Sequence, residues 1–492
     1  MMPKDRALEL KAKLSKVFGD YSKQIEFELL FSALIEVNPH NSTDDLLAWL
    51  KDLNHRQYFN VEEIPFSKLK QWHFDKGSGD LRHDSGKFFS IRGYQVFDSR
   101  SEAVLWDQPI IDQPEIGVLG ILCKRIDGIL YFLMQAKAEP GNINTYQISP
   151  TVQATRSNYL RVHGGRRTRY LEYFTGEIPI TVVVDQFQSE QGARFMGKRN
   201  RNILVIDETD NYLELGENHR WFTLGQLKSL MECDNTVNMD SRSIMSQIRY
   251  LSSDFTLDIS TLLSILNEYQ DIVSRSDFWL KSVLQTFTTA QSKHNLSTVR
   301  NRLIWERYFC YVDKKPVPLN NVREWSIGEK IIEHRAGKYF QVLAVRIRAN
   351  NREVDSWDQP IIRQRHDGLI GVMCSEIEGV LHFLIRMKLE PGLYDLIELA
   401  PTVQCIKQNY DPGDHPKYLE CFKDTPQVFK ARQSEEGGRF YRECSTNMIQ
   451  VVEYNEIEIA PGYIWISLKQ LKELVQYQQL LNVELRSLLA YF

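Results

Sequence analysis

Apolar residues recur at helical spacing in two stretches of the chain. Residues 5–36 have them every three or four positions, and Ser42, Thr43 and Asp44 then offer N-caps for DDLLAWLKDL at 44–53. Residues 254–296 have the same character and contain no proline or glycine. We therefore expect a helical lead-in over residues 1–60 and a helical connector over residues 251–300.

Elsewhere the pattern favours strands. In GVLGILCKRIDGILYFLMQAK (117–137), apolar and polar residues alternate around Asp127-Gly128, which predicts a hairpin with a tight turn. Glu378-Gly379 occupies the matching place in the second half. FTLGQLKSLME (222–232) predicts an amphipathic helix capped by Thr223. Strands accompanied by helices predict a mixed sheet and an α+β fold.

The chain contains an internal repeat. WDQPII occurs at 106–111 and again 251 residues later at 357–362. At the same offset, Ile116–Gln153 and Asp367–Gln404 share 16 identical residues in 38 positions, including KxEPG and PTVQ. QSEQGARF at 188–195 later pairs with QSEEGGRF at 433–440. A repeat of this length marks two copies of one unit, so we predict repeats over residues 61–250 and 301–492.

The amino-acid composition is that of a folded globular protein and argues against nucleic-acid-binding and membrane proteins. The 492 residues are 42% hydrophobic and 25% charged, as in folded globular domains. Lys and Arg number 60 against 64 Asp and Glu, and a net charge of −4 gives no general attraction to nucleic acid or anionic membranes. No run of about 20 apolar residues and no secretion signal is present. We expect cytoplasmic residence, without nucleic-acid or membrane partners.

The KxEPG motif places a lysine and a glutamate at the end of a predicted strand. Lys137 and Glu139 stand two positions apart and therefore share one face of that strand, as does Lys388 with the glutamate that follows it. Such a pair suits acid–base chemistry, or it is a structural ion pair that neutralises itself. Glu139 also suits a turn in which its carboxylate binds backbone amides. These alternatives stay open.

The QSExGxRF motif predicts a short helical turn before the next strand. On a helix, Glu190 and Arg194 would lie side by side, as would Glu435 and Arg439. Such a pair stabilises a helix, but an arginine fork also suits a diphosphate, with Ser189 as a neighbouring polar contact.

The segment TVQATRSNY (Thr151–Tyr159) is the most site-like stretch. It collects hydroxyl, amide and guanidinium groups directly after a predicted strand, which favours ligand contact over an ordinary loop. Its predicted ligand-contacting residues are Thr155, Arg156, Ser157, Asn158 and Tyr159. The second repeat has TVQCIKQNY, which retains Val403 and Gln404 but changes the residues that follow, so the two repeats are not equivalent.

Other candidate groups are less informative. Trp72 and Trp325 lie at comparable points ahead of the two repeats, where each either stacks on a pyrimidine or fills the core. His163 has no counterpart and His382 replaces Tyr131, so no metal-binding triad is repeated. GxGxxG, GxxxxGK[ST], GxSxG and HExxH are absent, which removes support from dinucleotide-binding, kinase and hydrolase functions.

Taken in order, SRSEAVLWDQPI, QAKAEPGN, SPTVQATRSNY, QSEQGARF, KRNRN and DNTVNMDSRS resemble the nucleotide-hexose 2,3-dehydratases of deoxysugar pathways. The resemblance covers both halves and implies a tandem duplication of a Nudix-like mixed-sheet domain flanked by helices, assembled as a homodimer. Glu435, Glu436 and Gly438 match only the tail of a Nudix box, and Ala431 and Arg432 stand where Arg and Glu belong. We therefore expect no metal and no pyrophosphate hydrolysis.

The resemblance also implies a reaction. It is the elimination of water across C2–C3 of dTDP-4-keto-6-deoxy-D-glucose, giving dTDP-3,4-diketo-2,6-dideoxy-D-glucose, which a 3-ketoreductase then consumes. The C4 ketone acidifies the C3 proton, so a base, an acid and donors to the enolate suffice, and no cofactor is needed. A non-catalytic nucleotide-sugar binding or scaffolding protein is the alternative.

We expect Glu139 or Glu190 to act as the base and Lys137 to assist. The first repeat is favoured for chemistry because its loop keeps more hydroxyl groups, with the second as an accessory nucleotide site or a wall; the reverse stays open. The residues expected to bind the substrate are Trp72, Thr155, Arg156, Ser157, Asn158, Tyr159, Ser189, Arg194, Trp325, Lys388, Val403, Gln404, Glu435 and Arg439.

Overall fold

The computed structural model describes residues 3–38, 40–155, 168–250, 258–273, 276–287, 291–350, 354–422 and 427–492. Its α-helices are α1 (Pro3–Phe18), α2 (Ile25–Leu34), α3 (Thr43–Arg56), α5 (Leu224–Leu230), α6 (Met239–Met245), α7 (Ile259–Asn267), α8 (Asp277–Gln285), α9 (Leu296–Tyr308), α10 (Leu468–Leu474) and α11 (Val483–Leu489).

The strands of the first half are β1 (Phe59–Ile64), β2 (Trp72–Phe74), β3 (Leu81–His83), β4 (Ser90–Asp98), β5 (Val104–Asp112), β6 (Val118–Ile126), β7 (Ile129–Ala138), β8 (Tyr146–Ser149), β9 (Val152–Ala154), β10 (Ile180–Ser189), β11 (Arg199–Asp207) and β12 (His219–Phe222). Those of the second half are β13 (Val312–Val317), β14 (Trp325–Ile327), β15 (Ile331–His334), β16 (Phe340–Ala349), β17 (Ser356–Gln364), β18 (Gly368–Ile377), β19 (Val380–Leu389), β20 (Ile397–Ala400), β21 (Val403–Cys405), β22 (Gln427–Ser434), β23 (Cys444–Val451) and β24 (Tyr463–Ser467).

Each half contains a mixed sheet of seven strands with the same order. In the first half it runs β10-β11-β6-β7-β12, with β8 and β9 attached to β7 and β6. In the second half β22-β23-β18-β19-β24 repeats that order, with β20 and β21 attached to β19 and β18. β11 runs parallel to β6 and β23 parallel to β18, and the other pairs are antiparallel. The predicted α+β class and the tandem duplication are confirmed.

The predicted hairpin turns are present in both sheets. Asp127 and Gly128 join β6 to β7 with φ of 50° and 79°, and Glu378 and Gly379 join β18 to β19 with 51° and 77°. Two successive residues with positive φ make the type I′ turn that matches the twist of a hairpin. Thr223 caps α5 as predicted, and its hydroxyl accepts from the Gln226 N–H.

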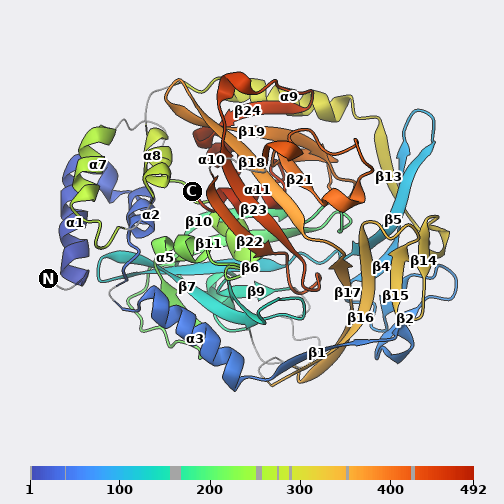
Figure 1. Cartoon of the computed structure of the whole chain (residues 1–492). Coiled ribbons are helices and arrows are strands. Elements are labelled where there is room, and N and C mark those ends of the chain that lie inside the picture. Colours follow the sequence, from blue (N-terminus) through green and yellow to red (C-terminus); the bar gives the residue numbers. More distant parts are fainter. Residues whose placement is uncertain are drawn as a thin grey trace.

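The two halves exchange strands. Each half also has an antiparallel sheet of five strands, and one strand in each comes from the other half. β1 pairs with β16 of the second half, and β13 pairs with β4 of the first. Figure 1 shows blue β1 beside orange β16, and yellow β13 beside the blue β4–β5 hairpin. The halves are therefore intertwined and share one folded body.

The mixed sheets meet across two short helices, α6 and α11. Both carry a fully buried arginine that binds the opposite half. Arg242 of α6 donates to Gln433 Oε1 at 2.6 Å and to the Ser434 carbonyl at 2.8 Å. Arg486 of α11 donates to the Ser189 carbonyl, which is the matching contact in the other direction. Because charged groups without partners are costly to bury, these contacts fix how the halves meet.

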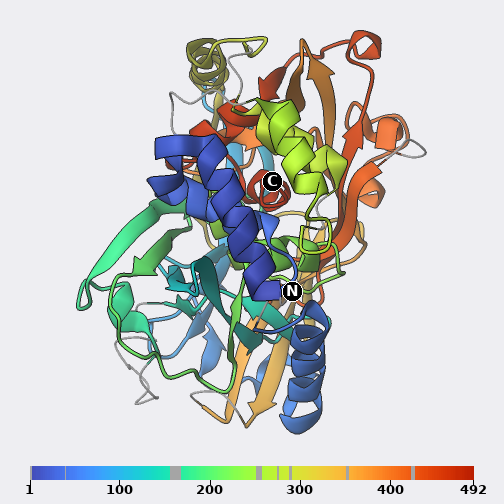
Figure 2. The same cartoon turned by 90° about the vertical axis from the view of Figure 1, so that its left-hand side faces the viewer.

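The predicted helices at the start and in the middle of the chain form one layer. Residues 5–36 form α1 and α2, and α7 and α8 come from the connector region. Figure 2 shows the α1 and α2 helices beside α7 and α8, in front of the sheets. The Lys13 ammonium lies 2.8 Å from the Glu268 carboxylate and links α1 to the residue after α7. Within the described ranges no helix is both long and apolar enough to span a membrane.

Candidate functional site

A cavity of about 520 Å³, which we call the first cleft, opens on the mixed sheet of the first half. The groups from the first half that line it include Trp72, Phe89, Lys137, Glu139, Gln153, Thr155, Glu190, Lys198, Asn200 and Asp240. The groups from the second half are Val354, Ser356, Trp357, Asp358, Gln359, Glu436, Gly438 and Arg439. The cavity is therefore walled by both repeats.

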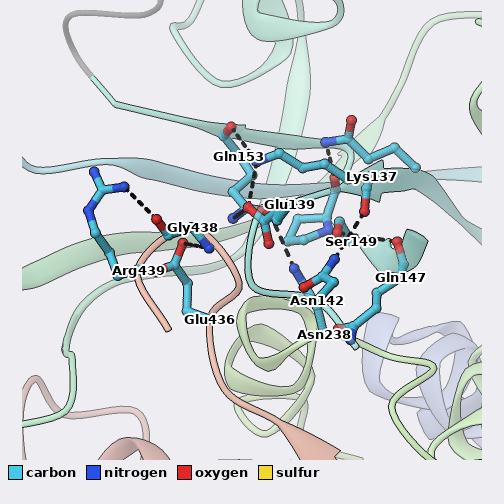
Figure 3. Close-up of polar contacts among 12 residues, drawn as sticks. Lys137, Glu139, Asn142, Gln147, Ser149, Gln153, Asn238, Glu436, Gly438 and Arg439 are labelled. Atoms are coloured by element: carbon cyan, nitrogen blue, oxygen red, sulfur yellow. Dashed lines mark hydrogen bonds and ion pairs between the residues drawn. The ribbon is translucent and has the colours of Figure 1, made fainter. Parts of the chain in front are cut away.

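Glu139 lies at the centre of the polar wall, as Figure 3 shows. Its Oε1 atom accepts from Gln153 Nε2 at 3.0 Å and lies 3.3 Å from Lys137 Nζ. Oε2 is buried and has no hydrogen-bond partner among the described residues. Gln153 is itself oriented by the Asn238 amide, which donates to Gln153 Oε1 at 3.3 Å. One oxygen of Glu139 is therefore held in place, and the other is left for a ligand.

A loop from the second half closes over this wall. The Gly141 N–H, directly after Glu139-Pro140, donates to the Gly437 carbonyl at 2.7 Å, and the Arg442 N–H donates back to the Gly141 carbonyl at 2.7 Å. A Cβ atom at Gly141 would overlap the Phe440 carbonyl oxygen, and one at Gly437 would lie 3.0 Å from Glu139 Cβ. Glycine is required at position 141 because the two backbones touch there.

This loop brings Glu436 and Arg439 into the first cleft. Glu436 Oε1 accepts from the Gly438 N–H at 3.0 Å. Burial raises the pKa of Glu436 to about 7, and the neighbouring Glu139 carboxylate adds to that effect. The Arg439 guanidinium lies 4.1 Å from the centre of the Phe89 ring and donates to the Gly438 carbonyl at 2.9 Å and to Gln113 Oε1 at 3.2 Å.

Further charged groups line the base of the cavity. Glu190 accepts from Asn200 Nδ2 at 2.6 Å, and burial raises its pKa. Burial lowers the pKa of Lys198 to about 8 even though Glu190 opposes that effect, and Lys198 Nζ donates to the Glu115 carbonyl. Burial also raises the pKa of Asp240 far above its ordinary value. The cavity thus combines carboxyl groups that resist ionisation with cations that are poorly solvated.

The opposite end of the first cleft is aromatic. Trp72 is 8% exposed and packs 4.9 Å from the Phe89 ring, so it fills the core and contributes only an edge to the cavity. Its indole N–H donates to the Asp358 carbonyl at 2.8 Å. The WDQPII strand of the second half therefore fixes Trp72, and Gln359 of the same motif binds the Gly438 carbonyl at 2.7 Å.

The second half repeats the arrangement in a group of residues that we call the second site. Lys388 Nζ lies 2.7 Å from Glu390 Oε1, which also accepts from Gln404 at 3.2 Å. Arg194 lies 4.4 Å from the centre of the Phe340 ring, and the Trp325 indole donates to the Asp107 carbonyl at 3.1 Å. The loop that closes over the second site comes from the first half, because the Gly392 N–H donates to the Gly192 carbonyl.

The structure therefore divides the predicted site residues between two places. Trp72, Lys137, Glu139, Thr155, Glu190 and Arg439 line the first cleft. Trp325, Lys388, Gln404, Arg194 and Glu435 belong to the second site, where Glu435 accepts from Gln191 at 2.8 Å. Val403 is fully buried, and Ser189 is buried against Glu398 at 2.7 Å. Arg156, Ser157, Asn158 and Tyr159 lie outside the described residues.

The predicted helical turn in QSEQGARF is present as a single turn, but the expected pairing of Glu190 with Arg194 is wrong. Residues 190–195 form a tight turn in which the Arg194 and Phe195 N–H groups both donate to the Gln191 carbonyl, at 3.0 and 2.9 Å. The turn sends Glu190 into the first cleft and Arg194 towards Phe340, so the two side chains do not pair. The backbone follows the closing loop, whose contacts lie in the other repeat and outweigh local helix propensity.

Four residues that line the first cleft were not predicted as site residues from the sequence: Glu436, Lys198, Asn200 and Asp240. Their counterparts in the aligned repeats are Gln191, Glu443, Ser445 and Glu484. Each substitution changes charge, hydrogen-bonding capacity or side-chain length in an otherwise matching motif. A comparison of the two repeats restricted to such changes would have singled out these positions. Glu436 and Lys198 line the same cavity because the loop of the second repeat closes over the first repeat. The sequence alone does not show this closure.

Two comparisons with known proteins bear on the site. The family model described as NDP-hexose 2,3-dehydratase matches residues 43–248 and 297–492. A protein of Amycolatopsis orientalis, named dTDP-4-dehydro-6-deoxy-alpha-D-glucopyranose 2,3-dehydratase, is 39% identical over 91% of this chain and 89% of its own length. Proteins with the same name from Saccharopolyspora spinosa and Streptomyces violaceoruber are 38% and 36% identical, over 93% and 90% of this chain and 93% and 95% of their own lengths.

Proposed function

The chain belongs to the NDP-hexose 2,3-dehydratase family, and we propose that its first cleft eliminates water from a dTDP-4-keto-6-deoxyhexose. The reaction crosses C2–C3 of dTDP-4-keto-6-deoxy-D-glucose and gives dTDP-3,4-diketo-2,6-dideoxy-D-glucose. The observation that carries the proposal is the Glu139 carboxylate, which has one oxygen tied to Lys137 and Gln153 and the other oxygen buried without a partner.

Glu139 is the base in this proposal. The C4 ketone makes the C3 proton acidic, and a positioned carboxylate removes such protons effectively. Lys137 holds Glu139 in place through the ion pair and supplies positive charge near the enolate that forms at C4. Loss of the C2 hydroxyl then leaves an enol that becomes the 3-ketone. Oxidation states balance without an external electron carrier, since the substrate is isomeric with the product plus water.

The rest of the first cleft is proposed to hold the nucleotide. The aromatic end with Trp72 and Phe89 suits a pyrimidine ring. Arg439 stacks on Phe89, and its Nη2 atom has no protein partner among the described residues, so it is free to donate to a diphosphate. Thr155 and the run Arg156–Tyr159 that follows remain proposed substrate contacts. Glu190 remains a second candidate base.

The second site is proposed as an accessory nucleotide site or as a supporting wall. Trp325, Lys388, Gln404, Arg194 and Glu435 are its polar and aromatic groups. Ser189 and Val403 also stay in the proposal as predicted substrate contacts, although both are buried.

Other parts of the proposal concern architecture and partners. We propose that each repeat is Nudix-like, that residues 61–250 and 301–492 are the duplicated units, and that residues 1–60 and 251–300 are lead-in and connector. We further propose a homodimer in the cytoplasm. A 3-ketoreductase is the expected next enzyme because a 3,4-diketone is reactive and is stabilised by reduction.

The experiment is direct. The purified chain is incubated with dTDP-4-keto-6-deoxyglucose without nicotinamide, and o-phenylenediamine is added to trap any vicinal diketone as a quinoxaline. Mass spectrometry is expected to find the adduct of a sugar that has lost one water. Tight binding of the sugar nucleotide with no adduct would support the non-catalytic alternative, a binding or scaffolding protein.

A further inference from the structure

Glu436 enters the first cleft from the second repeat, and we propose that its carboxyl group is the acid that protonates the departing C2 hydroxyl. The inference rests on the proposed function and adds a catalytic residue to it. It makes the active site composite, with the base on one repeat and the acid on the other.

The placement of the two carboxyl groups carries the argument. Glu139 and Glu436 line the same cavity of about 520 Å³. The backbone beside Glu436 passes close to the side chain of Glu139, since a Cβ atom built on Gly437 would lie 3.0 Å from Glu139 Cβ. Figure 3 shows the second-repeat loop with Glu436 and Arg439 next to Glu139. A sugar ring bound in this space would face both carboxyl groups.

The surroundings of Glu139 and Glu436 differ, as those of a base and an acid should. Glu139 has the ammonium of Lys137 and the amide of Gln153 as partners. Glu436 accepts one backbone N–H, and its burial together with the charges of Glu139 and Glu190 outweighs the opposing effects of Arg439 and Lys137. A buried carboxyl group that retains its proton near neutral pH is suited to act as an acid.

The second site provides an internal comparison. It keeps the lysine, the glutamate and the glutamine of the first cleft as Lys388, Glu390 and Gln404. The residue that its closing loop supplies in place of Glu436 is Gln191. An amide hydrogen-bonds but does not release a proton at neutral pH. The second site therefore has the lysine, glutamate and glutamine without a carboxyl group at this position of its closing loop, which favours the first cleft for the elimination.

The proton transfers balance as follows. The C3 proton passes to the Glu139 carboxylate, and the electron pair of the C3–H bond forms the C3–C4 enolate. The enolate collapses, the C2–O bond breaks, and the Glu436 proton joins the leaving oxygen, so that water departs and a C2–C3 double bond remains. Ketonisation moves one proton from the C3 hydroxyl to C2. Glu139 ends protonated and Glu436 ionised, and exchange with solvent restores both.

The test separates proton removal from loss of the hydroxyl. Wild-type protein, Glu436→Gln and Glu139→Gln are incubated with dTDP-4-keto-6-deoxyglucose in D2O. Deuterium at C3 is followed by NMR, and elimination by trapping the diketone. Glu436→Gln is expected to lose about 100-fold or more in elimination while still exchanging the C3 proton within about tenfold of wild type. Glu139→Gln is expected to lose both reactions.

Controls keep the result interpretable. Glu443→Gln makes the same change in a buried carboxyl group beside the second site and is expected to leave both reactions near wild type. Thermal unfolding and the affinity for dTDP show whether Glu436→Gln folds and binds. Elimination by Glu436→Gln at near the wild-type rate would overturn the inference, as would joint loss of exchange and elimination in a variant that still binds dTDP. Failure of wild type to eliminate water would instead overturn the proposed function.

Discussion

Replacing Gly141 by alanine is expected to damage the first cleft by moving the loop of the second repeat. A Cβ atom at Gly141 overlaps the Phe440 carbonyl oxygen and lies 2.8 Å from the Gly437 carbonyl oxygen, both backbone atoms that cannot rotate away. The loop must shift, which weakens the two 2.7 Å hydrogen bonds that Gly141 makes with Gly437 and Arg442. At about 0.5–1.5 kcal/mol each, their loss lowers the free energy of unfolding by about 1–3 kcal/mol.

The same shift moves Glu436 and Arg439, which the loop carries. A displacement of about 1 Å in a reacting group costs roughly 100-fold in rate. We therefore expect kcat/KM for the elimination to fall about 100-fold in Gly141→Ala.

The chain offers a matched control in Gly392. A Cβ atom there would overlap the Phe195 carbonyl oxygen. Gly392 makes the equivalent 2.7 Å hydrogen bonds in the other half, with Gly192 and Gly197. Gly392→Ala is expected to lower the urea midpoint as much as Gly141→Ala, while kcat/KM falls clearly less than in Gly141→Ala, because the loop that it moves carries neither Glu436 nor Arg439 and borders the first cleft only at Glu190, Phe195 and Lys198. The measurements are urea unfolding and diketone trapping. Equal loss of activity in both variants, or a larger loss in Gly392→Ala, would refute the assignment of catalysis to the first cleft.

Three other outcomes follow from the described contacts. Because burial raises the pKa of Glu436 to about 7 and the protonated form is the acid, kcat/KM should fall as the pH rises above about 7; a flat profile up to pH about 9 would contradict this. Trp72→Phe should raise KM several-fold with little change in kcat, in steady-state kinetics, if the indole edge contacts the nucleotide; a lower kcat at constant KM would speak against it. Arg486→Met should lower the free energy of unfolding by about 3 kcal/mol, because the Ser189 carbonyl and Ser243 hydroxyl lose their buried partner; an unchanged unfolding curve would show that the contact is dispensable.

Local sequence signals were sufficient for much of the fold. Two residues, Asp127 and Gly128, predict the hairpin because the turn conformation they favour is decided by their own backbones. Thr223 predicts its helix for the same reason, since the cap bonds to a residue three positions away. The duplication was visible because identical residues recur at a constant offset.

The exchange between the repeats was not predictable from these signals. β1 pairs with β16 of the second half, a strand more than one repeat further along the chain, and periodicity does not say which partner a strand takes. Periodicity also does not predict that the QSExGxRF loop of each repeat closes over the other repeat. This closure explains why Arg439, a residue of the second repeat, lies in the cleft of the first. Glu436 differed from Gln191 by one functional group, and only the closed structure gives that difference a chemical meaning.

The most direct test of the whole account compares Glu139→Gln with Glu390→Gln. Both substitutions remove a carboxylate that is paired with a lysine two residues earlier, so their structural costs are alike. The rate of diketone formation from dTDP-4-keto-6-deoxyglucose is measured for each. We predict a loss of about 100-fold or more for Glu139→Gln and a rate within about fivefold of wild type for Glu390→Gln. A normal rate in Glu139→Gln, or the larger loss in Glu390→Gln, would contradict elimination in the first cleft.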